Sequence, residues 1–193
     1  MHPHDNLKPF STGRAMDDTH LPPAPSGIHI SGSETRESYW QPVPANGHID
    51  VALAPHIVGM EHPFALGTQS VAPGGYVREH THERNEEAIY VIEGHGRAVV
   101  DGKEYPLGPD SVVFLPKNVR HMFINDGETQ LRWLWLIVPN GLEDFFRLIG
   151  KPRKPGERVP SNFPRPENVL EIERKTVFGA DLVDKFDPTK QNP

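Results

Sequence analysis

Turn-forming sequences divide the middle of this chain, from about Tyr39 to Pro139, into short apolar or alternating runs. The Asp-Gly step at 101–102 and the Asn-Asp-Gly step at 125–127 are strong signals for turns between neighbouring strands. The runs recur roughly every ten residues, a spacing typical of antiparallel sandwiches and barrels. No helical periodicity competes with this pattern, so we predict an all-β domain of antiparallel strands. The expected strands are residues 49–53, 65–71, 88–92, 97–100, 112–115, 121–124 and 131–138.

Composition changes on either side of this region, and we assign the predicted β domain to residues 37–140. Residues 1–36 contain the proline cluster at 22–25 and few large apolar side chains. Such a segment buries too little apolar surface to offset the entropy of ordering it, so we expect a partly disordered N-terminal arm. The short alternation at 28–30 leaves an edge strand open as an alternative for that part of the arm.

Residues 141–193 are predicted to form a helical and Pro-rich C-terminal extension. Residues 142–149 read as a short helix that ends at a glycine, and residues 167–177 read as a second helix preceded by a proline. Five prolines between them, in residues 151–166, favour an extended linker. We expect the polar last fifteen residues to be frayed. The expected docking face of the first helix consists of Phe145, Phe146 and Ile149.

Several classes of protein are excluded by composition. The 193 residues include no cysteine, which rules out a disulfide scaffold, a thiolate metal site and a cysteine nucleophile. The formal net charge of −6 disfavours binding to nucleic acid, which depends on neutralising phosphates. No apolar run approaches the ~20 residues of a membrane span, and the N-terminus lacks the apolar stretch of a signal peptide. We therefore expect a cytoplasmic protein with no nucleic-acid or membrane partner.

Histidines and a glutamate occur together in a pattern suited to a metal ion. His80 and His82 are separated by one residue on an expected strand, so their imidazoles project from the same face. Glu87 begins the next apolar run after a polar turn, and His121 stands at the start of a later strand. Three neutral imidazoles and a carboxylate suit divalent iron, manganese, nickel, copper or zinc.

These two segments resemble the sequence patterns of the cupin superfamily. The first pattern, G-(x)5-H-x-H-(x)4-E-(x)6-G, is matched at every fixed position, namely Gly74, His80, His82, Glu87 and Gly94. The second pattern, G-(x)5-P-x-G-(x)2-H-(x)3-N, is matched at Pro116, His121 and Asn125.

The second segment departs from the pattern where Asp110 and Asn118 replace glycines. Asparagine tolerates a left-handed backbone better than most other residues, so the turn at Asn118 remains compatible with the pattern. Because Asp110 replaces the other glycine, the sequence leaves open only which form the turn before the expected strand 112–115 takes.

The resemblance implies a cupin-type antiparallel β-barrel or jelly roll, often dimeric, with an N-terminal arm and short C-terminal helices here. It also implies one divalent metal ion per chain, held inside the barrel by His80, His82, Glu87 and His121. Glu86 is the neighbouring alternative, but it faces the other side of a strand and does not fit the family spacing. Fe(II) is the favoured ion, with Mn(II), Ni(II) and Zn(II) as alternatives.

Further residues are weaker candidates for a role in substrate binding or packing. Tyr76 and Arg78 share the strand parity of His80, and we expect them to face the cavity and orient a substrate. Arg78 fits a carboxylate clamp or, equally, an ion pair with a nearby acid, and Tyr76 also suits packing at the barrel mouth. Trp133 and Trp135 share one sheet face, which favours packing in the core or in a dimer over a substrate wall. Asn125 suits either a ligand contact or, preferably, a turn.

The favoured function is that of a non-haem iron dioxygenase acting on a small oxygen-chelating aromatic, keto or hydroxy-acid substrate. One alternative is a non-oxidative isomerase, decarboxylase or cyclase in which Mn, Ni or Zn serves as a Lewis acid. A second alternative is a cupin that binds a small molecule without catalysis, since one fold hosts many functions. The expected partners are a small-molecule substrate and a second copy of the chain in a homodimer.

Overall fold

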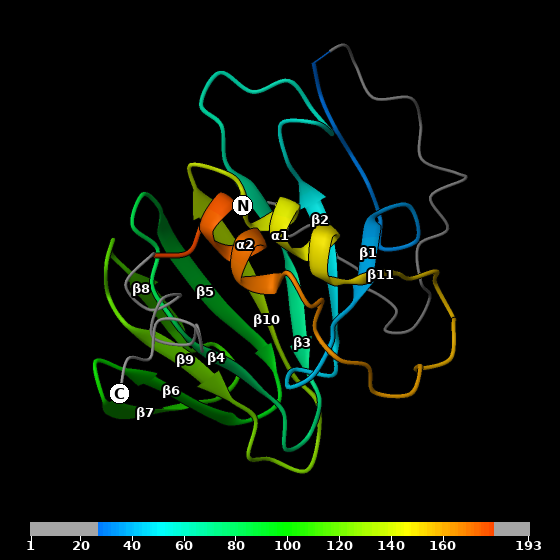
Figure 1. Cartoon of the computed structure of the whole chain (residues 1–193). Coiled ribbons are helices and arrows are strands. Elements are labelled where there is room, and N and C mark those ends of the chain that lie inside the picture. Colours follow the sequence, from blue (N-terminus) through cyan, green and yellow to red (C-terminus); the bar gives the residue numbers. More distant parts are fainter. Residues whose placement is uncertain (1–26, 180–193) are drawn as a thin grey trace, which may run out of the picture.

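The computed structural model describes residues 27–179, and the described part folds into two antiparallel β-sheets and two helices. The larger sheet has seven strands in the order β11-β1-β2-β3-β10-β5-β8 (Figure 1). In chain order these strands are β1 (Glu37–Trp40), β2 (His48–Leu53), β3 (Ala65–Val71), β5 (Glu86–Glu93), β8 (Val112–Leu115), β10 (Leu131–Val138) and β11 (Lys151–Pro152).

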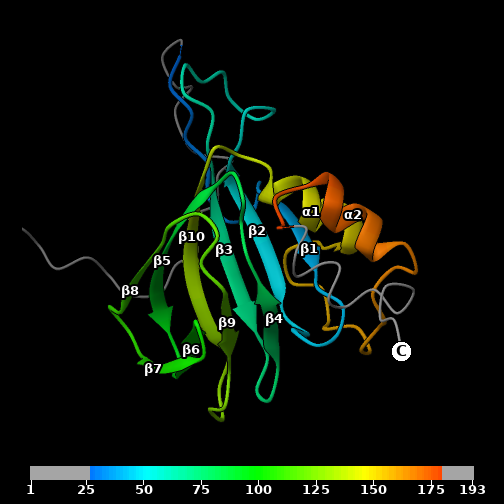
Figure 2. The same cartoon turned by 60° about the vertical axis from the view of Figure 1, so that its left-hand side comes forward.

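The smaller sheet has four strands in the order β4-β9-β6-β7 and packs against the larger one (Figure 2). Its strands are β4 (Tyr76–His80), β6 (Gly96–Val100), β7 (Lys103–Leu107) and β9 (His121–Ile124). All strand pairs in both sheets are antiparallel, and neighbours in space are often distant in sequence, as for β3 with β10. The predicted all-β jelly roll is therefore confirmed.

The core lies between the sheets and is centred on β10. This strand pairs with β3 on one side and β5 on the other, so its inward side chains are covered from all directions. Trp133 and Trp135 are 1% and 0% exposed, and the ring of Phe123 from the smaller sheet lies 5.2 Å from that of Trp133. Of the two roles expected for these tryptophans, core packing is the correct one. The homodimer stays a prediction.

Two short helices cover the cavity side of this sandwich, near β1 and β2 (Figure 2). Helix α1 (Leu142–Ile149) buries Phe145, Phe146 and Ile149, as predicted, and the ring of Phe146 lies 5.7 Å from that of Trp135. Helix α2 (Val169–Lys175) packs beside α1 and buries Ile172. Between the helices the chain is extended and forms only the short strand β11, which agrees with the expected linker.

The sequence patterns missed three strands, namely β1, β7 and the two-residue β11. β7 has four exposed residues out of five and contains Pro106, which an edge strand tolerates because its outer side needs no hydrogen bonds. β1 is only four residues long and therefore shows little alternation. Residues 28–30, the alternative edge strand, form no strand. The disorder expected for the rest of the arm concerns residues up to 26, which lie outside the described part. Most of the C-terminal end that we expect to be frayed also lies outside it.

Within the described residues, no helix has both the length and the apolar character needed to cross a membrane.

The two departures from the cupin pattern both adopt a left-handed backbone. Asp110 has φ 69° and Asn118 has φ 64°, values at which most side chains are strained. Asparagine and aspartate are the residues that reach this region most easily after glycine, because their short side chains bond locally. Both turns therefore keep the conformation for which the pattern has glycine.

Replacing Gly67 with alanine is expected to destabilise the fold. Gly67 lies in β3, where an added Cβ would come within 2.2 Å of the backbone oxygen of Asp50 and 2.5 Å of the Trp135 ring. Overpacking of this kind costs about 1–3 kcal/mol, and thermal unfolding followed by circular dichroism measures the loss. Gly59→Ala is the matched control, because a Cβ there meets no atom within 4 Å. Equal melting temperatures for the two variants would contradict this account of the β3–β10 contact.

Candidate metal centre

His80, His82, Glu87 and His121 come together at one end of the space between the sheets. Their ligand atoms all lie within 4.8 Å of one another. β4 and β9 pair with His80 directly opposite His121, which places these two ring centroids 4.0 Å apart. His82 lies just beyond the end of β4, and Glu87 projects inward from β5. The structure thus brings together all four side chains that the sequence pattern singled out.

The three imidazoles are held in one tautomer by the backbone. The Nδ1 atom of His80 donates to the Arg78 carbonyl at 2.7 Å, and that of His121 donates to the Val119 carbonyl at 2.9 Å. The Nδ1 atom of His82 donates to the Val177 carbonyl at 3.0 Å. A carbonyl can only accept, so each Nδ1 carries the proton and each Nε2 keeps a lone pair. Hydrogen bonds of this kind orient the histidine ligands of metal sites.

The interior of the cluster contains acceptors without donors. Glu87 is 5% exposed, and its Oε2 lies 3.4 Å from the Nε2 atoms of both His82 and His121. None of these three atoms has a hydrogen-bond partner. Buried acceptors without a partner are costly, and a divalent cation among them would satisfy all of them at once. The residues present therefore fit a single divalent ion, while its identity is not fixed by them.

The charge states of these groups suit metal binding. Burial lowers the pKa of His80 well below its ordinary value, and the neighbouring His121 and His82 lower it further. Burial by itself raises the pKa of the Glu87 carboxyl, but hydrogen bonds and charge from His121 and His82, when these carry a proton on Nε2, lower its pKa by more and keep the carboxylate ionised. A neutral imidazole and an ionised carboxylate are the forms that bind a metal ion.

Glu86, the neighbouring alternative, is exposed and lies outside the cluster. Successive residues of β5 alternate between the two faces, so only one of the two adjacent glutamates can face inward. The geometry agrees with the preference for Glu87, and the assignment of the four residues as metal ligands stays a prediction.

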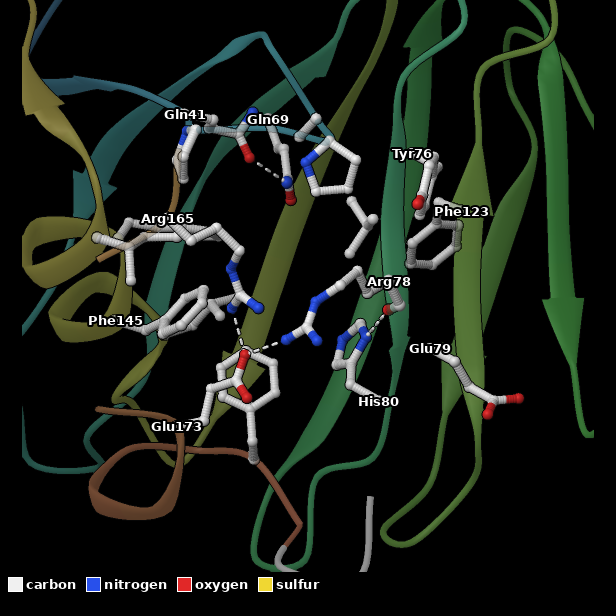
Figure 3. Close-up of a pocket in the computed structure, with 18 of the residues that line it drawn as sticks. Gln41, Gln69, Tyr76, Arg78, Glu79, His80, Phe123, Phe145, Arg165 and Glu173 are labelled. Carbon is white, nitrogen blue, oxygen red and sulfur yellow. Dashed lines mark hydrogen bonds and ion pairs between the residues drawn. The ribbon is translucent and has the colours of Figure 1, made fainter. Parts of the chain in front are cut away.

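A cavity opens next to the cluster and is lined by His80 and Glu87 (Figure 3). The space between its walls, counted out to the open mouth and including open solvent, is about 800 Å³. Most of the wall is apolar and comes from both sheets and from the C-terminal extension. Its larger apolar side chains are Val77, Phe123, Leu142, Phe145, Phe146, Ile149 and Phe178.

Tyr76 and Arg78 both line this cavity, but not in the way that simple alternation predicts. Val77 pairs with Phe123 and His80 pairs with His121, so three residue steps of β4 match two of β9. This bulge breaks the parity between Tyr76 and His80. Tyr76 is 40% exposed, whereas Arg78 reaches into the cavity and forms an ion pair. Their roles toward a substrate stay predictions.

The ion pair of Arg78 involves Glu173 of α2, and Arg165 contacts the same carboxylate (Figure 3). Of the two roles considered for Arg78, the structure shows the ion pair, and it places this pair in the cavity wall.

The C-terminal extension also covers the cluster itself. The ring of Phe178 lies 5.2 Å from that of His80 and 5.6 Å from that of His82. The Gly179 amide donates to the Thr81 carbonyl at 2.8 Å. Sequence reasoning missed these residues because they lie far along the chain in a segment without a motif, and only tertiary packing brings them to the site.

Asn125 holds loops together and does not line the cavity. It is 0% exposed, and its Nδ2 donates to the carbonyls of Val71 and Thr129. Its Oδ1 accepts from the Gly127 amide at 3.1 Å, which closes the turn. The preferred interpretation of this residue as part of a turn is confirmed.

Comparison with known proteins identifies the family. The family model described as "Cupin domain" matches residues 67–137. Polyketide synthase CurC from Streptomyces cyaneus is 33% identical over 93 residues, or 48% of this chain and 60% of that protein. Protein SchB from Streptomyces halstedii is also 33% identical over 93 residues, or 48% of this chain and 67% of that protein. The chain belongs to the cupin superfamily.

A solved structure agrees with this fold. The polyketide cyclase RemF from Streptomyces resistomycificus has a TM-score of 0.51 and 23% sequence identity, over 57% of this chain and 79% of that chain. The chain spans about 60% of CurC and 67% of SchB. Arg165, Glu173 and Phe178 lie beyond the residues that the family model covers.

Replacing Glu87 with glutamine is expected to weaken metal binding far more than the same change at Glu86. Loss of a group that only orients a ligand costs 10–100-fold in metal affinity, so loss of the buried carboxylate should cost at least about 100-fold. Elemental analysis of purified protein measures the metal-to-chain ratio, and circular dichroism verifies the fold. The exposed Glu86→Gln variant, one residue away, is the control. Equal metal loss in both variants would contradict the choice of Glu87.

Proposed function

We propose that this protein is a metal-dependent enzyme that acts on a small organic molecule through that molecule's oxygen atoms. The observation that carries the proposal is a buried set of four electron-pair donors beside an apolar cavity. His80 is the member of the set that is half-buried and faces this cavity together with Glu87. A purely structural ion would need no such opening, because closed sites serve stability and open sites serve catalysis.

His80, His82, His121 and Glu87 would hold the ion. When bound, it would polarise a carbonyl or hydroxyl oxygen of the substrate and, if it is iron, provide a site for O₂. The backbone carbonyls that accept from the three Nδ1 atoms keep the imidazoles fixed in direction. The aromatic and aliphatic wall limits how a substrate can lie, which lowers the entropic part of the barrier.

The first candidate reaction is non-oxidative ring closure of a compound with several keto groups. The names of two similar proteins, polyketide synthase CurC and polyketide cyclase RemF, favour it. In this reaction a carbon next to one ketone would give up a proton and add to a second ketone of the same molecule, and the alkoxide formed there would take up a proton. The resulting hydroxyl and a neighbouring hydrogen would then leave as water. The apolar cavity supports such a reaction because it suits a folded carbon chain.

The second candidate reaction is dioxygenation, the function favoured by the sequence. The observation that favours it is the donor set, since imidazoles combined with a carboxylate and open coordination positions suit non-haem iron. The two candidates differ in their co-reactant, because dioxygenation consumes O₂ and ring closure does not.

Measuring O₂ consumption together with product mass distinguishes the two candidates. We expect protein loaded with one divalent ion at a time to convert a linear triketone into a ring that is lighter by one water. No O₂ would be consumed, as followed by mass spectrometry and an oxygen electrode. Oxygen uptake with diketones, hydroxyacetophenones or catechols, seen only with Fe(II), would instead establish the dioxygenase.

The control for either reaction is the pair Glu87→Gln and Glu86→Gln. We expect Glu87→Gln to lose the ion and with it all turnover, and Glu86→Gln to keep both, because only Glu87 faces the cluster. A stoichiometric metal content without turnover of any of these compounds would count against an enzyme and favour the binding cupin.

A further inference from the structure

We infer that the cavity binds an organic carboxylate, with the charged group held by Arg165 and Arg78 and the apolar body lying toward the metal cluster. This inference rests on the proposed function, since it names the class of substrate for the same cavity. It depends on residues of the C-terminal extension, which the cupin family model does not cover.

The first argument is the geometry around Glu173. Both Arg78 and Arg165 donate through Nη2 to the same oxygen, Oε1, of this carboxylate (Figure 3). Arg78 comes from β4 and Arg165 from the linker before α2, and all three residues line the cavity. Two guanidinium groups therefore already hold one carboxylate inside this cavity. The planar guanidinium is the group best suited to bind carboxylates.

The second argument is charge. Among the described residues in this part of the wall, the two guanidinium groups and the Glu173 carboxylate have formal charges that add up to +1. The Glu173 side chain is only 3% exposed, and those of Arg165 and Arg78 are 17% and 27% exposed. The cavity wall also contains the acids Glu79 and Glu87. Glu79 points away from the two arginines (Figure 3), and Glu87 faces the imidazoles of His82 and His121. An excess positive charge away from bulk water favours an anionic ligand.

The third argument is the composition of the remaining wall. Phe145 and Phe178 pack against each other with ring centroids 4.5 Å apart, and Phe178 also contacts the ring of His80. Arg78 and His80 are two residues apart on the same strand. A ligand that is held at the arginines therefore lays its carbon skeleton on aromatic rings and directs its other end to the cluster. This arrangement suits a carboxylic acid with an aromatic or otherwise apolar body.

Glu173 then has a specific part in binding, because it occupies the arginines as an internal carboxylate with which the ligand competes. Neutralising Glu173 should strengthen binding of an anion, whereas removing a guanidinium should weaken it. A merely structural ion pair would show no such opposite effects, because loss of either partner would only loosen the wall.

Benzoate serves as the probe, and benzamide, with the same shape and no charge, is the control ligand. Isothermal titration calorimetry is carried out on the full chain, both metal-loaded and metal-stripped, for the wild type and three variants. We expect Arg165→Gln to weaken benzoate binding about tenfold and Glu173→Gln to strengthen it by a similar factor, as for one charge-assisted hydrogen bond. Arg158→Gln is the matched control in the same extension, because Arg158 is exposed and does not line the cavity. Benzamide affinity should be equally low in all four proteins.

Benzoate affinity that is unchanged by Arg165→Gln, or equal to that of benzamide, would overturn the inference. Weaker binding by Glu173→Gln, in a variant that melts at the wild-type temperature, would overturn the role given to Glu173. If Glu173→Gln does not fold, the Arg165→Gln comparison alone decides. Binding of benzoate by the arginines does not require the metal ion. The expected order of benzoate affinities in metal-stripped protein would therefore hold even if the protein catalysed no metal-dependent reaction. Binding that occurs only with metal would count against the arginines as the anion site.

Discussion

The pairing of β4 with β9 determines where the cluster forms. It sets His80 opposite His121, and the bulge in β4 shifts the face on which the residues before His80 lie. Without the extra residue, regular alternation would place Val77 and His80 on opposite faces. With it, both follow the register of Phe123 and His121, so the metal cluster and the apolar wall face the same space. The site therefore depends on a local irregularity in an otherwise regular sheet.

The site is also shared between the barrel and the extension that follows it. The barrel contributes the four donor atoms and most of the residues that line the cavity. The extension contributes the carbonyl that orients His82, the ring that covers His80, and the two charged residues that pair with each other beside Arg78, namely Arg165 and Glu173. Because one fold hosts many functions, such an extension is a place where members of the superfamily with the same barrel can differ.

Much of this architecture could be predicted from the sequence, for identifiable reasons. Strands such as β3, β8, β9 and β10 were predicted at their observed bounds because turn-forming residues, among them proline and aspartate, stand close to their ends and because they contain apolar or alternating runs. The four residues of the cluster were predicted because their spacing matches a family pattern. In contrast, β7 is an exposed edge strand without an apolar face and has no such pattern.

The parts of the site that could not be predicted depend on contacts across long stretches of sequence. The alternation of faces that we predicted along β4 is interrupted by the bulge, and no residue type in this strand indicates that a bulge is present. The contacts of Glu173 with Arg78 and Arg165 depend on how α2 docks, and a charged residue in a short helix resembles any solvated one. Local periodicity reports which face of an element is apolar, but it does not report which distant element covers that face.

The hydrogen bond from His82 to the Val177 carbonyl affects the order in which the parts of the cluster can form, because the two residues are 95 positions apart in the chain. Synthesis proceeds from the N-terminus, so all four donor side chains leave the ribosome before Val177 does. His82 therefore acquires its fixed orientation only after the last described segment has docked against the barrel. A chain that stopped before Val177 would contain all four donor side chains but would lack the carbonyl that fixes the direction of the His82 imidazole.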